Sequence, residues 1–239
     1  MEIKFDNEQR TRYRGHISLC EIDLQGQQRL AEGRVLIIGA GGLGSPLGLY
    51  LAAAGVGTIG IMDADTVSLS NLQRQIMHGT SDIGRLKVES AREAMTEINP
   101  HVKVDIYPEF LTSGNAKELL GSYDIIVDCT DNLDTRLLIN DTCVEIGKPY
   151  VYGAVYRFSG QVFTYVPGSA NYREIFDTDA ARDELPCAID GVMNTVVGVV
   201  GTLQATEVVK YIVKTGDLLT NRLLMFDAIS MTFNTFETN

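Results

Sequence analysis

Apolar runs and amphipathic stretches alternate along the first 148 residues. Val35 to Ile38 form an apolar run without alternation, which is typical of a strand buried on both faces of a parallel sheet. Further strands are predicted at 58–62, 102–107 and 124–128, and helices at 7–31, 45–55, 84–98, 115–121 and 133–147. This order predicts an α/β fold with a Rossmann-like, doubly wound and mostly parallel sheet.

The pattern changes after Pro149. Residues 150–166 alternate and are rich in Tyr, Val, Phe and Thr, so they suit antiparallel strands, and the last 18 residues predict one or two more. Residues 191–213 are apolar but interrupted by polar side chains, which favours a buried core helix over a membrane span. Residues 168–190 are polar and acid-rich, and are expected to form a long mobile loop.

Composition adds exclusions to this picture. The 239 residues carry a net charge of −11, which disfavours nucleic acid and anionic lipid as partners. The chain shows no secretory signal pattern and no CxxC pair, so a reduced, cytoplasmic protein is expected. The length suits one domain, 1–239, with a helical lead-in at 1–32 and two halves at 33–148 and 149–239.

A glycine-rich turn follows the first buried strand and opens a helix. Its glycines are Gly39, Gly41, Gly42 and Gly44, and such a turn lets backbone N–H groups approach a phosphate at the helix N-terminus. Asp63 ends the second strand, 19 residues after Gly44, where an acid can hold a ribose hydroxyl. A nucleotide site is predicted, with a turn needed only for packing as the alternative.

The segment after Asp63 favours a triphosphate over a dinucleotide. It carries candidate nucleotide contacts at Asp65, Ser70, Asn71, Arg74 and Gln75. Arg74 can clamp phosphate oxygens in a bidentate way, and Lys87 can add a point charge. The plainer interpretation is a solvated loop and a surface lysine.

Asp131 and Asn132 follow the strand at 124–128. An acid at the carboxyl end of a parallel strand points into the ligand crevice, where Asp131 could hold magnesium on the phosphates. Either residue could instead cap the helix that begins at residue 133, and Asn132 could do so as readily as bind nucleotide.

Six motifs together resemble the MoeB/ThiF/HesA family, relatives of the ubiquitin-activating enzymes. They are GAGGLGS, DADTVSLSNLQRQ, GRLKVESA, INP, DCTDN and GVMNTVVGVVGTLQATEVVK, spread from about residue 10 to about residue 235. The resemblance implies an adenylyltransferase that joins AMP from ATP to the C-terminal glycine of a small ubiquitin-like sulfur carrier ending in Gly-Gly. It also implies a homodimer, a sulfur donor such as a cysteine desulfurase, and a place in thiamin or molybdopterin biosynthesis.

The resemblance also implies residue roles. Gly41 and its neighbours lie along the nucleotide, Asp63 holds the ribose, and Asp131 binds magnesium near the reacting carboxylate. Asn71, Arg74 and Lys87 reach the phosphates. The half at 33–148 then binds nucleotide and the half at 149–239 binds the carrier.

Two features depart from the family pattern. The family usually begins with Arg-Tyr-x-Arg-Gln, whose second arginine crosses the dimer, but this chain has Gly15 there. Arg10 or Arg14 could substitute, and a solvated basic N-terminus is the alternative. Many members bind zinc through two CxxC pairs. The first would fall at Asn171 and Glu174, which do not form a thiolate site, so no zinc is expected.

Cys187 is a further candidate, because some relatives bond covalently to the carrier through a loop cysteine. The neighbouring acids at 183, 184 and 190 would raise its pKa, so a free thiol is the alternative. Cys20, Cys129 and Cys143 are expected to be packed thiols.

Three functions compete at this point. The first is ATP-dependent adenylation of a sulfur carrier. The second is a nicotinamide-binding oxidoreductase, which has no use for Asn71, Arg74 and Lys87 together. The third is a non-catalytic scaffold, which the displaced arginine and the missing cysteine pairs keep open.

Overall fold

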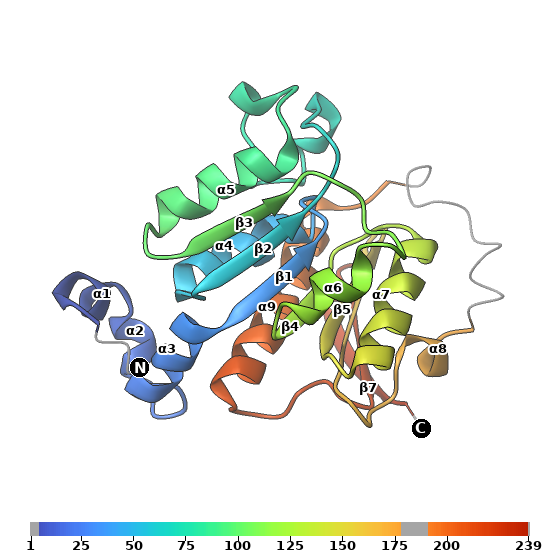
Figure 1. Cartoon of the computed structure of the whole chain (residues 1–239). Helices are drawn as coiled ribbons and strands as arrows, with labels where there is room; N and C mark the ends of the chain where they lie inside the picture. Colours follow the sequence, from blue (N-terminus) through green and yellow to red (C-terminus); the bar gives the residue numbers. More distant parts are fainter. Residues whose placement is uncertain (1–4, 178–190, 239) are drawn as a thin grey trace.

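The computed structural model describes residues 5–177 and 191–238, which form one mixed sheet flanked by helices (Figure 1). The eight strands run in the order β3-β2-β1-β4-β5-β6-β7-β8. Their bounds are β1 Arg34–Ile38, β2 Thr58–Met62, β3 Lys103–Tyr107, β4 Ile125–Asp128, β5 Tyr150–Tyr156, β6 Ser159–Tyr165, β7 Arg222–Asp227 and β8 Thr232–Glu237. The first five pair in parallel and the last three pair antiparallel, which confirms the predicted fold class.

Helices cover both faces of the sheet (Figure 1). Because side chains alternate along each central strand, every such strand contributes residues to the core on both faces. The larger helices are α4 Gly44–Ala54, α5 Lys87–Ile98, α6 Ala116–Gly121, α7 Leu133–Ile146 and α9 Asn194–Val213. Val35 and Ile37 of β1 pack into the core with α4, α5 and α9, whereas Leu36 and Ile38 pack into the core with α6 and α7. The unbroken apolar run of β1 thus reflects burial on both faces.

The predicted helical lead-in forms three short helices, α1 Asn7–Arg12, α2 Arg14–Ile17 and α3 Asp23–Glu32. Asp6 caps α1 by accepting the Gln9 N–H at 2.8 Å. Tyr13 is buried, and its hydroxyl accepts a hydrogen bond from Asn99 Nδ2 at 2.9 Å. These contacts attach the lead-in to the α5 side of the sheet.

Helix α9 is the predicted core helix. It is long and apolar enough to cross a membrane by length and composition alone, yet 56% of its most apolar window is buried inside the fold. Small residues let it pack closely: a Cβ on Gly201 would lie 2.5 Å from the Leu43 carbonyl oxygen. It begins at Asn194 rather than near residue 191, because Val192 bridges to Arg157 and Met193 occupies the N-cap.

The prediction of a mobile loop at 168–190 is wrong in its first part. Residues Tyr172–Ile175 form a helical turn, α8, and Tyr172 is buried with its N–H donated to Asn140 Oδ1 at 2.8 Å. Burial of an aromatic side chain and capping of the turn outweigh the polar composition. Residues 178–190, with Cys187, lie outside the described part of the chain.

Candidate functional site

The glycine turn between β1 and α4 requires glycine for steric reasons. Gly39 has a φ of +106°, and a Cβ there would lie 2.6 Å from the Cys129 carbonyl oxygen. A Cβ on Gly44 would lie 2.1 Å from the Gly39 carbonyl oxygen. Gly41 differs, since a Cβ there would meet only Gln75 Nε2, at an ordinary contact distance of 3.5 Å. The turn therefore needs glycine at Gly39 and Gly44 for packing, whereas no such contact requires glycine at Gly41.

The backbone N–H and the carbonyl of Ala40, within that turn, both form hydrogen bonds to side chains. The Ala40 N–H donates to Asp63 Oδ2 at 2.9 Å, and the Ala40 carbonyl lies 2.9 Å from His78 Nε2. A carbonyl only accepts, so Nε2 carries the proton, and Nδ1 then accepts from the Ser90 hydroxyl at 2.9 Å. Asp63 and His78 thus fix the orientation of the turn from two elements distant in sequence.

His78 is buried, and burial disfavours the charged form of its imidazole. Burial lowers the pKa of His78 below its ordinary 6.5, with Lys87 acting in the same direction. The Ala40 carbonyl and the carboxylates of Asp82 and Asp63 raise the pKa in part. The sequence reasoning missed this residue, because nothing local connects it to the turn 38 residues earlier.

A cavity of about 370 Å³ opens at the carboxyl ends of the parallel strands, beside the turn. Three cations and four acids are among its lining residues, namely Arg74, Lys87, Arg136, Asp63, Asp65, Glu109 and Asp131. The predicted Gly39, Gly41, Gly42, Gln75 and Asn132 also line it. Residues from four separate elements converge here, as expected at the topological switch of a doubly wound sheet.

Lys87 lies almost fully buried at the start of α5, between two carboxylates. Its Nζ is 2.8 Å from Asp65 Oδ2 and 3.8 Å from Asp63 Oδ2. Asp63 also accepts the N–H groups of Ala40 and Asp65, one on each carboxylate oxygen, both at 2.9 Å. Each of its oxygens retains a second lone pair for a ligand hydroxyl. Lys87 is therefore part of a charged cluster rather than a surface lysine.

Arg74 borders the cavity, whereas its neighbours Ser70 and Asn71 are not among the lining residues. Arg74 Nη1 donates to the Ser70 carbonyl at 3.2 Å. The Asn71 side chain accepts the Ser68 N–H at 3.2 Å across the short 3₁₀ turn Leu69–Asn71, and the Ser70 hydroxyl lies 2.9 Å from that of Ser68. These two polar side chains shape the loop, and their contact with nucleotide stays a prediction.

The end of β4 contributes a buried acid and an accessible one. Asp128 is fully buried and accepts the Thr130 N–H and hydroxyl at 2.9 and 2.7 Å, and burial raises its pKa. Asp131 is exposed on the cavity wall. Asn132 is the N-cap of α7, accepting the Thr135 N–H at 2.9 Å, so the capping interpretation of Asn132 is confirmed.

Several lining residues were not predicted. Glu109, Phe110 and Leu111 follow β3, and Arg136 lies in the first turn of α7. The first three could have been predicted from their position after a parallel strand. No local sequence feature indicated that Arg136 would line the cavity. Gln75 is buried, and its Oε1 has no hydrogen-bond partner within the described residues, which fits a polar ligand against the turn.

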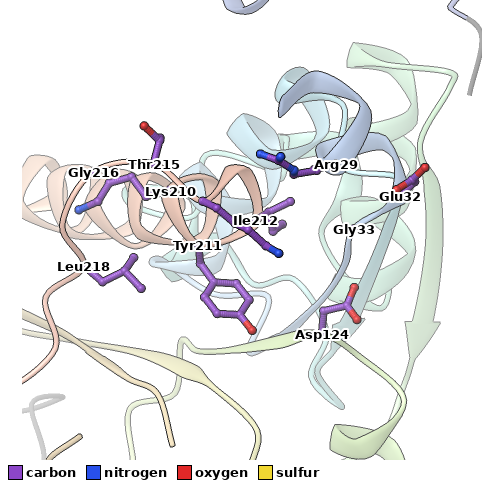
Figure 2. Close-up of a pocket in the computed structure, with 11 residues that line it drawn as sticks. Arg29, Glu32, Gly33, Asp124, Lys210, Tyr211, Ile212, Thr215, Gly216 and Leu218 are labelled. Carbon is purple, nitrogen blue, oxygen red and sulfur yellow. The ribbon is translucent and has the colours of Figure 1, made fainter. Parts of the chain in front are cut away.

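A second hollow, of about 570 Å³, lies at the opposite ends of the strands (Figure 2). Arg29 and Lys210 line it together with Glu32 and Asp124. Arg29 Nη1 donates to the Val213 carbonyl at 2.6 Å, and Lys210 pairs with Glu207. These cations close the C-terminal end of α9, as expected for a helix terminus. The two glycines of this hollow, Gly33 and Gly216, do not belong to the glycine-rich turn between β1 and α4.

The first cavity suits a polyphosphate with a divalent cation. Magnesium binds through one or two carboxylates and completes its octahedron with phosphate oxygens and water. Asp131 fits that role, and the described residues contain no cluster of three or more His, Cys, Asp or Glu that would hold a metal by themselves. Gly41 lines the cavity, so a phosphate in it would lie beside the turn.

The remaining predicted residues, except Cys129 on the cavity wall, lie apart from the cavity or outside the described residues. Cys187, with its proposed covalent role, belongs to the second group. Cys129 and Cys143 are buried as expected, but Cys20 is exposed, so its expected packing is wrong. Arg10 Nε donates to the Phe5 carbonyl at 3.1 Å within the lead-in.

Comparison with protein families gives one match over nearly the whole chain. The model of the ThiF family matches residues 13–239. A Mycobacterium tuberculosis protein named "Probable adenylyltransferase/sulfurtransferase MoeZ" is 44% identical over 234 residues, covering 95% of this chain and 60% of that protein. The Haloferax volcanii "SAMP-activating enzyme E1" is 42% identical over 236 residues, covering 98% and 87%. The chain thus spans about three fifths of the MoeZ relative.

Solved structures show the same fold at low sequence identity. E. coli MccB crystallised with ATP superposes with a TM-score of 0.78 at 23% identity, covering 90% of this chain and 65% of that chain. PaaA superposes with a TM-score of 0.83 at 23% identity, covering 98% and 75%.

Proposed function

The chain belongs to the ThiF family, and from this we propose that it is an ATP-dependent adenylyltransferase acting on a sulfur-carrier protein. The substrate would be the C-terminal glycine of a small ubiquitin-like carrier ending in Gly-Gly, and the product an acyl-adenylate. The observation that carries the proposal is the convergence of the glycine turn, Arg74 and Asp131 on one cavity. The relatives' names, adenylyltransferase/sulfurtransferase and activating enzyme, support it.

The reaction needs positioned charge more than acid–base groups. A carboxylate oxygen attacks the α-phosphorus of ATP, the new C–O–P linkage forms, and pyrophosphate leaves with the electron pair of the broken P–O bond. The attacking carboxylate is already ionised, so no proton has to be removed. The barrier arises from repulsion between anions, which fixed cations lower.

The residues of the cavity divide this work. The N–H groups of the turn and the Arg74 guanidinium would bind phosphate oxygens, and Asp63 would bind the ribose. Lys87 pairs with Asp63 and Asp65 and adds positive charge near the phosphates. Magnesium, when bound with the nucleotide, supplies further positive charge, and Asp131 is the residue that would hold it.

Several finer points belong to the same proposal. We infer a homodimer in the cytoplasm, a sulfur donor such as a cysteine desulfurase, no zinc, and service to thiamin or molybdopterin synthesis. The relatives' names mention molybdopterin synthase, which makes that route the first to test. The sulfur-transfer step itself would draw on Cys187 or on another protein.

The deciding experiment is ATP–pyrophosphate exchange with a small ubiquitin-like carrier protein that ends in Gly-Gly. Exchange that depends on the carrier, and is absent with a carrier lacking its last glycine, supports the proposal. NAD binding with no exchange would instead favour the oxidoreductase. Carrier binding with neither activity would favour the scaffold and overturn the proposed function.

A further inference from the structure

Arg136 is a partly buried cation on the cavity wall that the proposed chemistry does not yet use. It comes from the first turn of α7, directly after the Asp131 loop. Its Nη2 donates to the Thr130 carbonyl at 3.1 Å, and its guanidinium carbon lies 5.5 Å from the centre of the Tyr152 ring. The Tyr172 hydroxyl also interacts with it. Backbone and aromatic contacts therefore hold its plane in place.

The charge of Arg136 lacks a direct carboxylate partner in the described residues. Across 5–177 and 191–238, no Asp or Glu oxygen forms an ion pair with it within 4.0 Å. Asp128 lies near enough to act through space, but its Oδ1 is engaged by Thr130. Arg136 Nε is buried and has no acceptor among the same residues. A partly buried guanidinium with an unused donor and no direct carboxylate partner is stabilised by an anion that pairs with it.

The strand order shows which anion would reach it. Asp63 follows β2, the glycine turn follows β1, and Asp131 with Arg136 follows β4, so ribose and phosphate sites precede Arg136 along the sheet edge. Arg74 and the turn already serve the phosphates on one side. Beyond Arg136 the cavity is lined by Val155 of β5. An anionic group approaching the α-phosphate from the β4–β5 side would meet Arg136.

We propose that Arg136 binds the C-terminal carboxylate of the acyl substrate and orients it toward the α-phosphorus of the nucleotide. This inference rests on the proposed adenylation and names a residue for its second substrate. A guanidinium pairs with a carboxylate in a planar, bidentate manner, which fixes the direction in which an oxygen faces the phosphorus. The carboxylate loses its charge when the C–O–P linkage forms, and no proton passes through Arg136.

The role predicts a particular kinetic signature. Arg136 contacts the carboxylate before and during the attack, so its loss removes binding shared by the ground state and the transition state. Arg136→Met should raise the KM for the carrier by roughly 10- to 100-fold, the range for a lost hydrogen bond to a charged group. The Kd for ATP should stay within about two-fold of wild type. Arg136→Lys keeps the charge but loses the planar, bidentate guanidinium, so its KM for the carrier should lie between those of wild type and Arg136→Met.

A binding experiment tests the role without turnover. The probes are a synthetic peptide ending in Gly-Gly with a free carboxylate and the same peptide as a C-terminal amide, titrated by NMR in the presence of α,β-methylene ATP. Wild type should prefer the free acid by about ten-fold or more, and Arg136→Met should abolish that preference. Arg92→Gln removes one exposed positive charge from α5 and serves as the control that keeps the preference.

The outcomes separate this inference from the proposed function. Equal binding of acid and amide to wild type, or no binding of either, overturns the carboxylate role whatever the variants do. Equal weakening of both peptides, or loss of ATP-analogue binding in Arg136→Met, would indicate a merely structural arginine. An Arg136-dependent preference without any exchange would support the site while the proposed function fails. ATP–pyrophosphate exchange with an unchanged KM for the carrier in both Arg136 variants would support the proposed function and overturn the role of Arg136.

Discussion

Asn171 and Glu174 bond to each other at the two positions where many family members carry a cysteine pair. The Asn171 N–H and Nδ2 donate to Glu174 Oε2 at 2.8 and 2.6 Å, and Asn171 Oδ1 accepts the Arg173 N–H at 3.0 Å. Arg173 adds a two-point ion pair to Asp141 at 2.7 Å on each oxygen. This capping box and ion pair close the α8 turn by hydrogen bonds between side chains and backbone.

The capping box predicts a measurable stability effect and no dependence on zinc. Asn171→Ala removes the N-cap of α8 and should lower the free energy of unfolding by about 1 kcal/mol, the usual loss for a cap. Chelator treatment should leave the melting temperature of wild type unchanged. Denaturant unfolding and metal analysis measure the two effects. About one tightly held zinc per chain would contradict the second expectation, and Lys117→Ala, an exposed change, is the control for the first.

Arg74→Ala, Lys87→Ala and Asp131→Ala should each slow adenylation by roughly 10²- to 10³-fold, as expected for one preorganised electrostatic group. Lys87→Ala should also lower stability, because it leaves the partly buried Asp63 without its cation and removes the ion pair to the exposed Asp65. Exchange rates and thermal unfolding separate the two effects. Arg92→Ala, on the exposed face of α5, should behave like wild type. Near-normal exchange in all three variants would show that the site is misassigned.

His78 should make the fold sensitive to mild acid. Its pKa lies below the ordinary 6.5 in the folded protein, so the unfolded chain binds the proton more readily. The stabilisation is complete above pH 6.5 and is lost as the pH falls from there toward the lowered pKa. His78→Gln should flatten the change in unfolding free energy between about pH 7 and pH 5.5. His101→Gln is the control, and the same pH slope in wild type and His78→Gln would refute this account.

Cys187→Ala should keep ATP–pyrophosphate exchange within a few-fold of wild type. The adenylation step uses phosphate-binding cations, magnesium and a carboxylate, and none of these is a thiol. If Cys187 bonds to the carrier, the variant should lose a thiol-sensitive enzyme–carrier adduct in intact mass spectrometry. Cys20→Ser, at an exposed cysteine, is the matched control. Loss of exchange in Cys187→Ala would mean that the thiol supports adenylation after all.

The sequence by itself determined the elements and the turn. The strands at β1, β2 and β4 and the helices between them follow from apolar runs and 3.6-residue periodicity, which are local properties of the chain. The tight turn at 39–44 was predicted from its glycines, which is also local information. The positive φ of Gly39 and the close backbone contacts there exclude other side chains. Asp63 and Asp131 were predicted from their positions after strands, and both line the cavity.

Only the tertiary structure decided which distant side chains act together. His78 reaches Ala40 across 38 residues, Lys87 reaches Asp65 across 22, and Gln204 Nε2 donates to the Asp128 carbonyl at 2.7 Å across 76. Arg136 lies at the cavity with its guanidinium against the Tyr152 ring. Helix α8 forms inside an acid-rich stretch, where the Tyr172 N–H donates to Asn140. Periodicity reports which face of an element is buried, but the partner on that face depends on strand order and packing. These arise only when the whole chain folds.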